Sequence, residues 1–324
     1  MENRRRIVLR WADQGLLDSE SLEEALKLAE VIPDTSRWRI FVRNLFLWLG
    51  GLALAFSVMF FIAYNWDAIG RFAKFGLIEL LVAACVIVYW LRNPDSLVAR
   101  ISLMMAAILL GVLLAFYGQT YQTGADPWQL FATWALLMLP WALVSRFSAL
   151  WALWIALLNL SITLYFQARG GLFWFAYNLG ENLYWVLFLF NTVVWVAWEF
   201  LATRITWLQE RWTVRLVAIA CGVPITTLSC QAVFIQYPSR AVALLVYVAW
   251  LAILVAMYRK RIPDLFMLAG VCLSVIVFLT TFLGYHLLRS GDAVGGFLIM
   301  SLLVIGMVAG AAVWLKKIYR EQQA

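Results

Sequence analysis

The sequence predicts an all-α polytopic membrane protein with about ten transmembrane helices and both termini in the cytoplasm. Its 324 residues are 65% hydrophobic and only 13% charged, whereas an ordinary soluble domain is about 45–50% apolar and about 25% charged. So few charges cannot cover a water-facing surface, which argues against a soluble enzyme. Apolar runs of about twenty residues recur along the chain, and at about 1.5 Å per residue each run matches a hydrocarbon core of about 30 Å.

The polar N-terminal part, residues 1–44, predicts a short cytosolic helical pair. Gly15 ends the first helix and Pro33 ends the second, as helix-breaking residues do. Two short helices cannot bury a core of their own. We therefore expect them to pack on each other, on the membrane surface or on a partner.

The remaining chain predicts a bundle of ten transmembrane helices over residues 45–315, followed by a cytosolic tail at 316–324. Residues 167–182 contain glycines and several aromatic side chains, and their conformation stays open between a loop, an interfacial helix and a re-entrant segment. The predicted spans are 45–64, 73–91, 98–117, 128–145, 147–166, 183–201, 214–233, 241–258, 264–285 and 294–315.

The distribution of Lys and Arg predicts the orientation, because these residues are enriched in the cytoplasmic loops of membrane proteins. With the N-terminus inside, 20 of the 25 basic residues fall on the cytoplasmic side of the predicted spans. Topology therefore explains the net charge of +7, and no nucleic-acid partner is expected.

Ionisable side chains inside a span are costly in lipid and are candidates for function. Glu79 lies within the second predicted span. It is either a coupling or ligand-binding carboxylate, or a structural residue that forms an ion pair or is buried in its neutral form. Glu199, near the inner end of the sixth span, is interpreted as an interface anchor close to Arg204. Residues 202–215 contain tryptophans and arginines, and this composition predicts an amphipathic helix on the inner leaflet.

The densest polar signal lies on the predicted outer side. The first span ends in Asn65-Trp66-Asp67 and the third ends in Gly118-Gln119-Thr120-Tyr121. Amides and carboxylates beside aromatic rings can hold a polar ligand, although the same groups can simply cap helices and anchor the interface. The candidate ligand-binding or coupling residues are Asn65, Trp66, Asp67, Glu79, Gln119, Tyr121 and Asp126.

No cofactor or metal site is predicted. The four cysteines lie inside apolar runs without a CxxC pair, and His286 is the only histidine, which excludes bis-His haem ligation and a His-rich metal site. The chain contains no GxxxxGK[ST], HExxH or GxSxG motif. An enzyme is therefore not the favoured class. A lipid-head-group enzyme that uses Asp67, Glu79 and Asp126 as acid–base groups is a third reading.

The motifs of the N-terminal half resemble those of a bacterial family of predicted multispanning membrane proteins known as a domain of unknown function. The resemblance rests on the helical pair, on Asn65-Trp66-Asp67 after the first span and on Gly118-Gln119-Thr120-Tyr121 after the third, and covers roughly residues 5–170. It implies a polytopic helical fold in the bacterial inner membrane, within the cell envelope. It brings no established activity.

Two functions fit these features. The first is a transporter, or a permease that handles lipids or small ligands, with an outward-facing polar site. The second is a non-catalytic structural or assembly subunit of an envelope complex. This second reading fits a membrane-protein partner or a homo-oligomer, because Gly306 and Gly310 form a GxxxG pattern that allows close helix contact.

The basic-residue count generates a topology prediction. Reporter fusions after residue 93 and after the C-terminus should be active only with a cytoplasmic reporter, and a fusion after residue 68 only with a periplasmic one. The same reporter behaviour at residues 68 and 93 would contradict this orientation.

Overall fold

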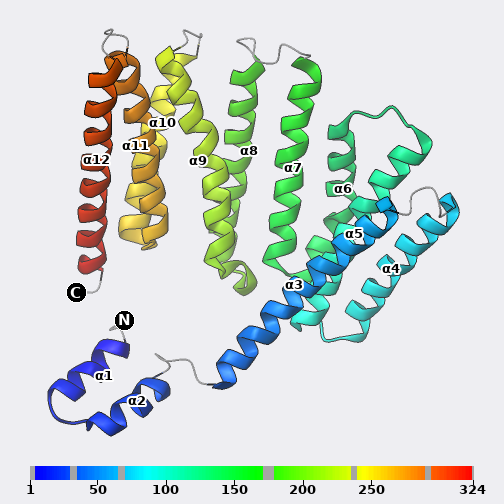
Figure 1. The fold of residues 1–324 in the computed structure, drawn as a ribbon, viewed down its shortest axis with the longest axis horizontal. Coiled ribbons are helices and arrows are strands. Elements are labelled where there is room, and N and C mark those ends of the chain that lie inside the picture. Colours follow the sequence, from blue (N-terminus) through cyan, green and yellow to red (C-terminus); the bar gives the residue numbers. More distant parts are fainter. Residues whose placement is uncertain are drawn as a thin grey trace. The chain divides into compact units, whose positions relative to one another are not determined.

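The computed structural model describes residues 4–29, 35–64, 70–170, 179–234, 239–288 and 293–322. Across these ranges every regular element is a helix, and ten helices are long and apolar enough to cross a membrane. The predicted all-α polytopic class is therefore confirmed, and the chain contacts a lipid bilayer. The helices divide into two compact units, residues 1–122 and 123–322, whose elements are labelled in Figure 1.

The N-terminal unit begins with two short helices that lie against each other, α1 (Arg4–Asp13) and α2 (Ser19–Leu28). Gly15 ends the first helix at φ +72°, a left-handed conformation that glycine adopts without steric cost. On α2, Lys27 pairs with Glu23 at 2.7 Å. The hydrogen bond and charge of Lys27 lower the pKa of Glu23.

The first membrane helix, α3 (Thr35–Tyr64), starts well before the apolar run at residue 45. Its 30 residues span about 45 Å at the α-helical rise, which exceeds a hydrocarbon core of about 30 Å. The extra turns carry Arg37, Arg39 and Arg43, which are good helix formers but too polar for lipid. Hydropathy alone therefore detects only the apolar part of the helix.

The helices α4 (Arg71–Leu91) and α5 (Leu97–Tyr121) form an antiparallel hairpin. Ile78, Leu109 and Phe116 are its buried core. α3 packs on the same helix α5, and a Cβ added at Gly51 of α3 would lie 2.9 Å from the side chain of Ile101. A glycine at this position therefore allows close approach of the two helices.

The second unit begins with the hairpin of α6 (Pro127–Ser145) and α7 (Ser148–Gly170). The turn between them is very tight, and Arg146 adopts φ +48° to close it. Across the hairpin, the indole N–H of Trp154 donates to the Ala135 carbonyl at 3.0 Å. Of the segment 167–182 left open above, residues 167–170 belong to α7 and residues 179–182 to α8 (Leu179–Ala202), whereas residues 171–178 lie outside the described ranges.

The main core of this unit is built by helices that run alongside one another (Figure 1). Ile225 and Leu268 are fully buried in it. The elements are α8 (Leu179–Ala202), a 3₁₀ turn η2 (Thr206–Gln209), α9 (Arg211–Phe234), α10 (Arg240–Ala256), a π-helical turn η3 (Met257–Arg261), α11 (Leu265–Leu288) and α12 (Ala293–Glu321).

A reciprocal amide pair joins α7 to α8. The side-chain amide of Asn159 donates to Asn191 Oδ1 at 3.0 Å, and the amide of Asn191 donates to Asn159 Oδ1 at 2.6 Å. Each amide also donates to the carbonyl four residues earlier in its own helix. Both side chains are thereby satisfied within the protein, as polar groups in hydrocarbon require.

Candidate functional site

The segment between α8 and α9 folds differently from the prediction. The amphipathic helix expected over 202–215 is wrong, because the chain turns after Ala202, forms η2 and starts α9 at Arg211. Leu208 of η2 is buried, and its carbonyl accepts a hydrogen bond from the Trp198 indole at 3.2 Å. This turn directs the first residues of α9 back toward α8 and α11.

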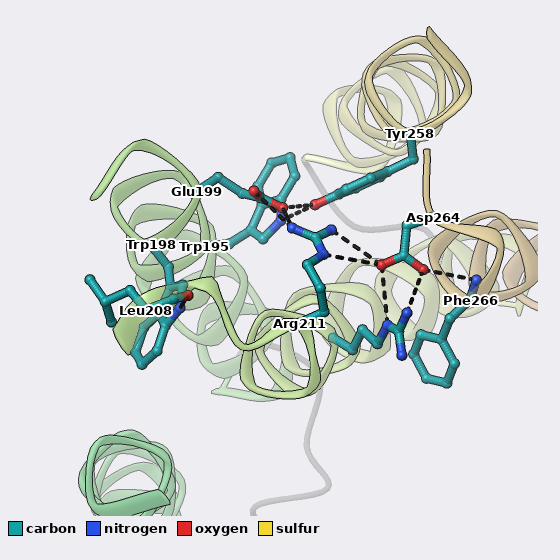
Figure 2. Close-up of polar contacts among 9 residues, drawn as sticks. Trp195, Trp198, Glu199, Leu208, Arg211, Tyr258, Asp264 and Phe266 are labelled. Carbon is teal, nitrogen blue, oxygen red and sulfur yellow. Dashed lines mark hydrogen bonds and ion pairs between the residues drawn. The ribbon is translucent and has the colours of Figure 1, made fainter. Parts of the chain in front are cut away.

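Arg211, the first residue of α9, lies between two carboxylates (Figure 2). Its Nη1 donates to both carboxylate oxygens of Glu199 at 3.1 and 3.2 Å. Its Nε and Nη2 donate to Asp264 Oδ2 at 3.3 and 3.2 Å. One guanidinium fork therefore ties α8 to the start of α11, using the planar donor geometry that lysine lacks.

Arg215, one turn further along α9, binds the same aspartate. Its Nε and Nη2 donate to the two oxygens of Asp264 at 3.1 and 3.2 Å. Asp264 also accepts from the Phe266 backbone N–H at 3.0 Å, so it caps α11. Two carboxylates thus balance two guanidinium groups in this cluster. We call it the inner ion network, after the side of the membrane that the sequence predicts for it, and its members are Glu199, Arg211, Arg215, Tyr258 and Asp264.

The pKa of Asp264 reflects this environment. Burial of the side chain would raise the pKa of the carboxyl group, but the hydrogen bonds and positive charges of Arg215 and Arg211 outweigh burial and hold it below its usual value. Asp264 is therefore ionised near neutral pH.

Tyr258 connects the inner ion network to α10. The residue is fully buried, its hydroxyl donates to Glu199 Oε1 at 2.5 Å, and the same hydroxyl accepts from the Trp195 indole at 2.9 Å (Figure 2). It lies in the π-helical turn η3, a rare conformation that often marks functional positions in helices.

The interpretation of Glu199 as an interface anchor close to Arg204 is also wrong. Glu199 is nearly buried and is paired with Arg211 and Tyr258. Arg204 instead places its guanidinium 5.2 Å from the ring centroid of Phe200. The carboxylate is thus part of the core of the bundle.

A groove of about 280 Å³ lies beside the inner ion network, between α9, α10 and α11. Its floor includes the buried side chains of Trp250, Leu254 and Met267. A Cβ added at Gly222 would lie 2.9 Å from the Trp250 ring, so this glycine lets the indole lie against α9. The groove is therefore a built feature of the helix packing.

The outer edges of the groove are apolar and exposed, and they include Ile219, Val223 and Leu273. Arg215 and Phe266 lie at one end, with the guanidinium 5.3 Å from the Phe266 ring centroid. From residue 215 to residue 227 of α9, the groove extends along about 18 Å of helix. A long apolar groove with a cationic residue at one end fits an amphiphile.

The sequence-predicted outer site is only partly described. Asn65, Trp66 and Asp67 lie outside the described residues. Glu79 on α4 and Gln119 and Tyr121 at the end of α5 are exposed, and the Tyr121 ring packs 4.8 Å from that of Tyr117. Asp126, also exposed, precedes α6 in the second unit and makes no side-chain capping bond. A shared ligand site for these residues stays a prediction.

Sequence reasoning missed Asp264, although two local signals point to it. Pro263-Asp264 directly precedes an apolar run, the pattern of a helix N-cap. Arg211 and Arg215 are spaced i,i+4, so both can face one acceptor. Within the described parts of the chain, no group of three or more His, Cys, Asp or Glu side chains could hold a metal ion.

The inner ion network generates a stability prediction. Asp264→Ala should lower the free energy of unfolding by about 2–4 kcal/mol, because two partly exposed arginines lose their shared carboxylate and α11 loses its cap. Titration of a denaturing detergent into mild-detergent micelles, followed by tryptophan fluorescence, measures this value.

Asp95→Ala is the matched control, since Asp95 is exposed and pairs with Arg100 on the surface at 3.1 Å. Its cost should stay within about 0–1 kcal/mol. Equal losses for the two variants would contradict the structural role given to Asp264.

Comparison with known proteins supports the resemblance found in the N-terminal half. No curated protein and no solved structure matches the chain. Residues 9–151 match the model of a family described as "Predicted membrane protein (DUF2157)". The match includes both outer motifs and ends before the inner ion network and the groove. Over residues 9–151 the chain is thus similar to a family of predicted membrane proteins of unknown function.

Proposed function

We propose that this protein resides in the bacterial inner membrane with both termini in the cytoplasm, and that it binds a membrane amphiphile in the groove between α9, α10 and α11. This proposal takes up the lipid-handling part of the function expected from the sequence. The observation that carries it is the shape and lining of the groove, which is long and apolar and lies in a membrane-spanning bundle.

The exposed edges of the groove support a ligand that comes from the bilayer. Ile219 and Val223 of α9 and Leu273 of α11 leave roughly half or more of their surface exposed. In a membrane span such side chains contact acyl chains. A lipid chain can therefore enter sideways, without crossing an aqueous opening.

The inner ion network supports this function by holding the groove in shape. Asp264 joins α9 to α11, the two long walls, and Tyr258 joins α10 through Glu199. A binding site whose walls are fixed before the ligand arrives loses less free energy to ordering on binding.

A second candidate, the structural or assembly subunit, is favoured by α12. The most apolar stretch of this helix has no buried residue, and a Cβ added at Gly306 or Gly310 would meet nothing within 4 Å. Native mass spectrometry after gentle purification tests this candidate. A monodisperse protein without a stoichiometric partner would count against it.

Filling the groove tests the proposed function. Gly270 lines the groove, and a Cβ there would meet nothing within 4 Å, so Gly270→Leu adds a side chain into open space. Displacing about two methylene groups of a bound chain should weaken retention of lipid roughly tenfold. Lipids that remain bound to the purified protein are quantified per protein molecule.

The matched control is Gly76→Leu on α4, where a Cβ also meets nothing within 4 Å. It should retain as much lipid as the wild type. Equal retention by Gly270→Leu would show that the groove is not where lipid is held.

The transport part of the expected function has its own test at Glu79. If Glu79 couples transport, Glu79→Gln should abolish uptake or efflux in proteoliposomes that the wild-type protein supports, because the amide can carry no charge. A wild type and a variant that are equally inert across a broad panel of solutes and lipids would contradict a transport role.

A further inference from the structure

The end of the groove carries a guanidinium with unused donor capacity. Arg215 engages Asp264 through Nε and Nη2, and none of the described residues accepts a hydrogen bond from its Nη1. Its side chain is 39% exposed. A second acceptor can therefore approach Arg215 without displacing Asp264, which keeps its bonds from Arg211 and the Phe266 N–H.

The hydroxyl groups of the groove wall already have partners. Thr226 and Ser274 share a hydrogen bond at 2.7 Å, and Ser274 shares another with Tyr247 at 3.0 Å. The Thr227 hydroxyl donates to the Val223 carbonyl at 2.8 Å. An acyl chain can lie against this wall without leaving a hydroxyl unpaired, so the polar part of a ligand belongs at Arg215.

The charge around this end favours an anion. The Tyr258 ring lies 5.7 Å from the Arg211 guanidinium, which places the end of α10 beside the start of α9. Basic side chains outnumber acidic ones over residues 199–215 and 257–264. Basic pockets between transmembrane helices on the cytoplasmic side favour anionic head groups.

The volume of the groove limits the number of acyl chains that it can hold. Its volume of about 280 Å³ is at the lower limit of pockets for small organic ligands, roughly 300 Å³. It therefore accommodates at most one acyl chain, and a second chain of the same lipid stays in the bilayer beside the exposed apolar edges.

We infer that the groove binds an anionic phospholipid of the inner leaflet, with the phosphate on Arg215 and one acyl chain along α9 and α11 toward Thr226. This assignment rests on the proposed function of the groove and adds the ligand class and the residue that selects it. The guanidinium is suited to the task because it binds phosphate through charge-assisted, directional hydrogen bonds.

Native mass spectrometry of the full-length protein in mild detergent tests the assignment. The probes are equimolar phosphatidylglycerol and phosphatidylcholine with identical acyl chains. The wild type should retain about tenfold more phosphatidylglycerol, in line with one charge-assisted contact. Arg215→Gln should remove the preference and still retain lipid, whereas Arg215→Lys should keep part of the preference.

Arg204→Gln is the control, because Arg204 lies at the same end of the bundle, over Phe200, and does not line the groove. It should keep the wild-type preference. A wild type that retains both lipids equally overturns the assignment, whether or not the Arg215 variants fold. Displacement of bound phosphatidylglycerol by an equal concentration of a free fatty acid would also overturn it.

The results separate this inference from the proposed function. If the wild type retains lipid without a head-group preference and Gly270→Leu loses that lipid, the anionic ligand is refuted and the groove is still a lipid site. If Gly270→Leu retains as much lipid as the wild type, both the anionic ligand and the proposed lipid-binding function of the groove are refuted.

Discussion

The second unit depends on the ion pairs that the carboxylate of Asp264 forms with Arg211 and Arg215. This carboxylate accepts hydrogen bonds from two arginines of α9 and from the backbone of α11, so three groups from two helices converge on one side chain that is 2% exposed. An ion of this kind is stable near lipid only when its partners surround it. Arg211 extends the same cluster to Glu199, and Tyr258 adds the end of α10.

The inner ion network and the groove share a residue, which gives Arg215 two roles. Its guanidinium holds Asp264, and the same residue lines one end of the groove. A ligand at that end of the groove would therefore contact a group that also fixes the distance between α9 and α11. A ligand that binds Arg215 in this arrangement would therefore also stabilise the folded bundle, because it binds the folded state and not the unfolded chain.

The sequence predicts the helices better than the contacts between them. Apolar runs identify the ten spans because lipid demands about twenty apolar residues in a row, yet they place the start of α3 too late, where arginines continue the helix beyond the hydrocarbon. The hydropathy pattern places Glu199 and Asp264 at the ends of spans but does not indicate which residues they pair with. Their pairing with Arg211 requires the turn at η2, which depends on Leu208 packing into a core formed by distant segments.

The reciprocal pair of Asn159 and Asn191 has a consequence for assembly in the membrane. Each amide is both donor and acceptor to the other, so the bonds form at one vertical offset of α7 and α8. A slip of one turn, about 5.4 Å, would break both hydrogen bonds between the two helices. The pair therefore fixes the position of α7 relative to α8 along the membrane normal after insertion. Nonspecific contacts between apolar side chains do not select one such position.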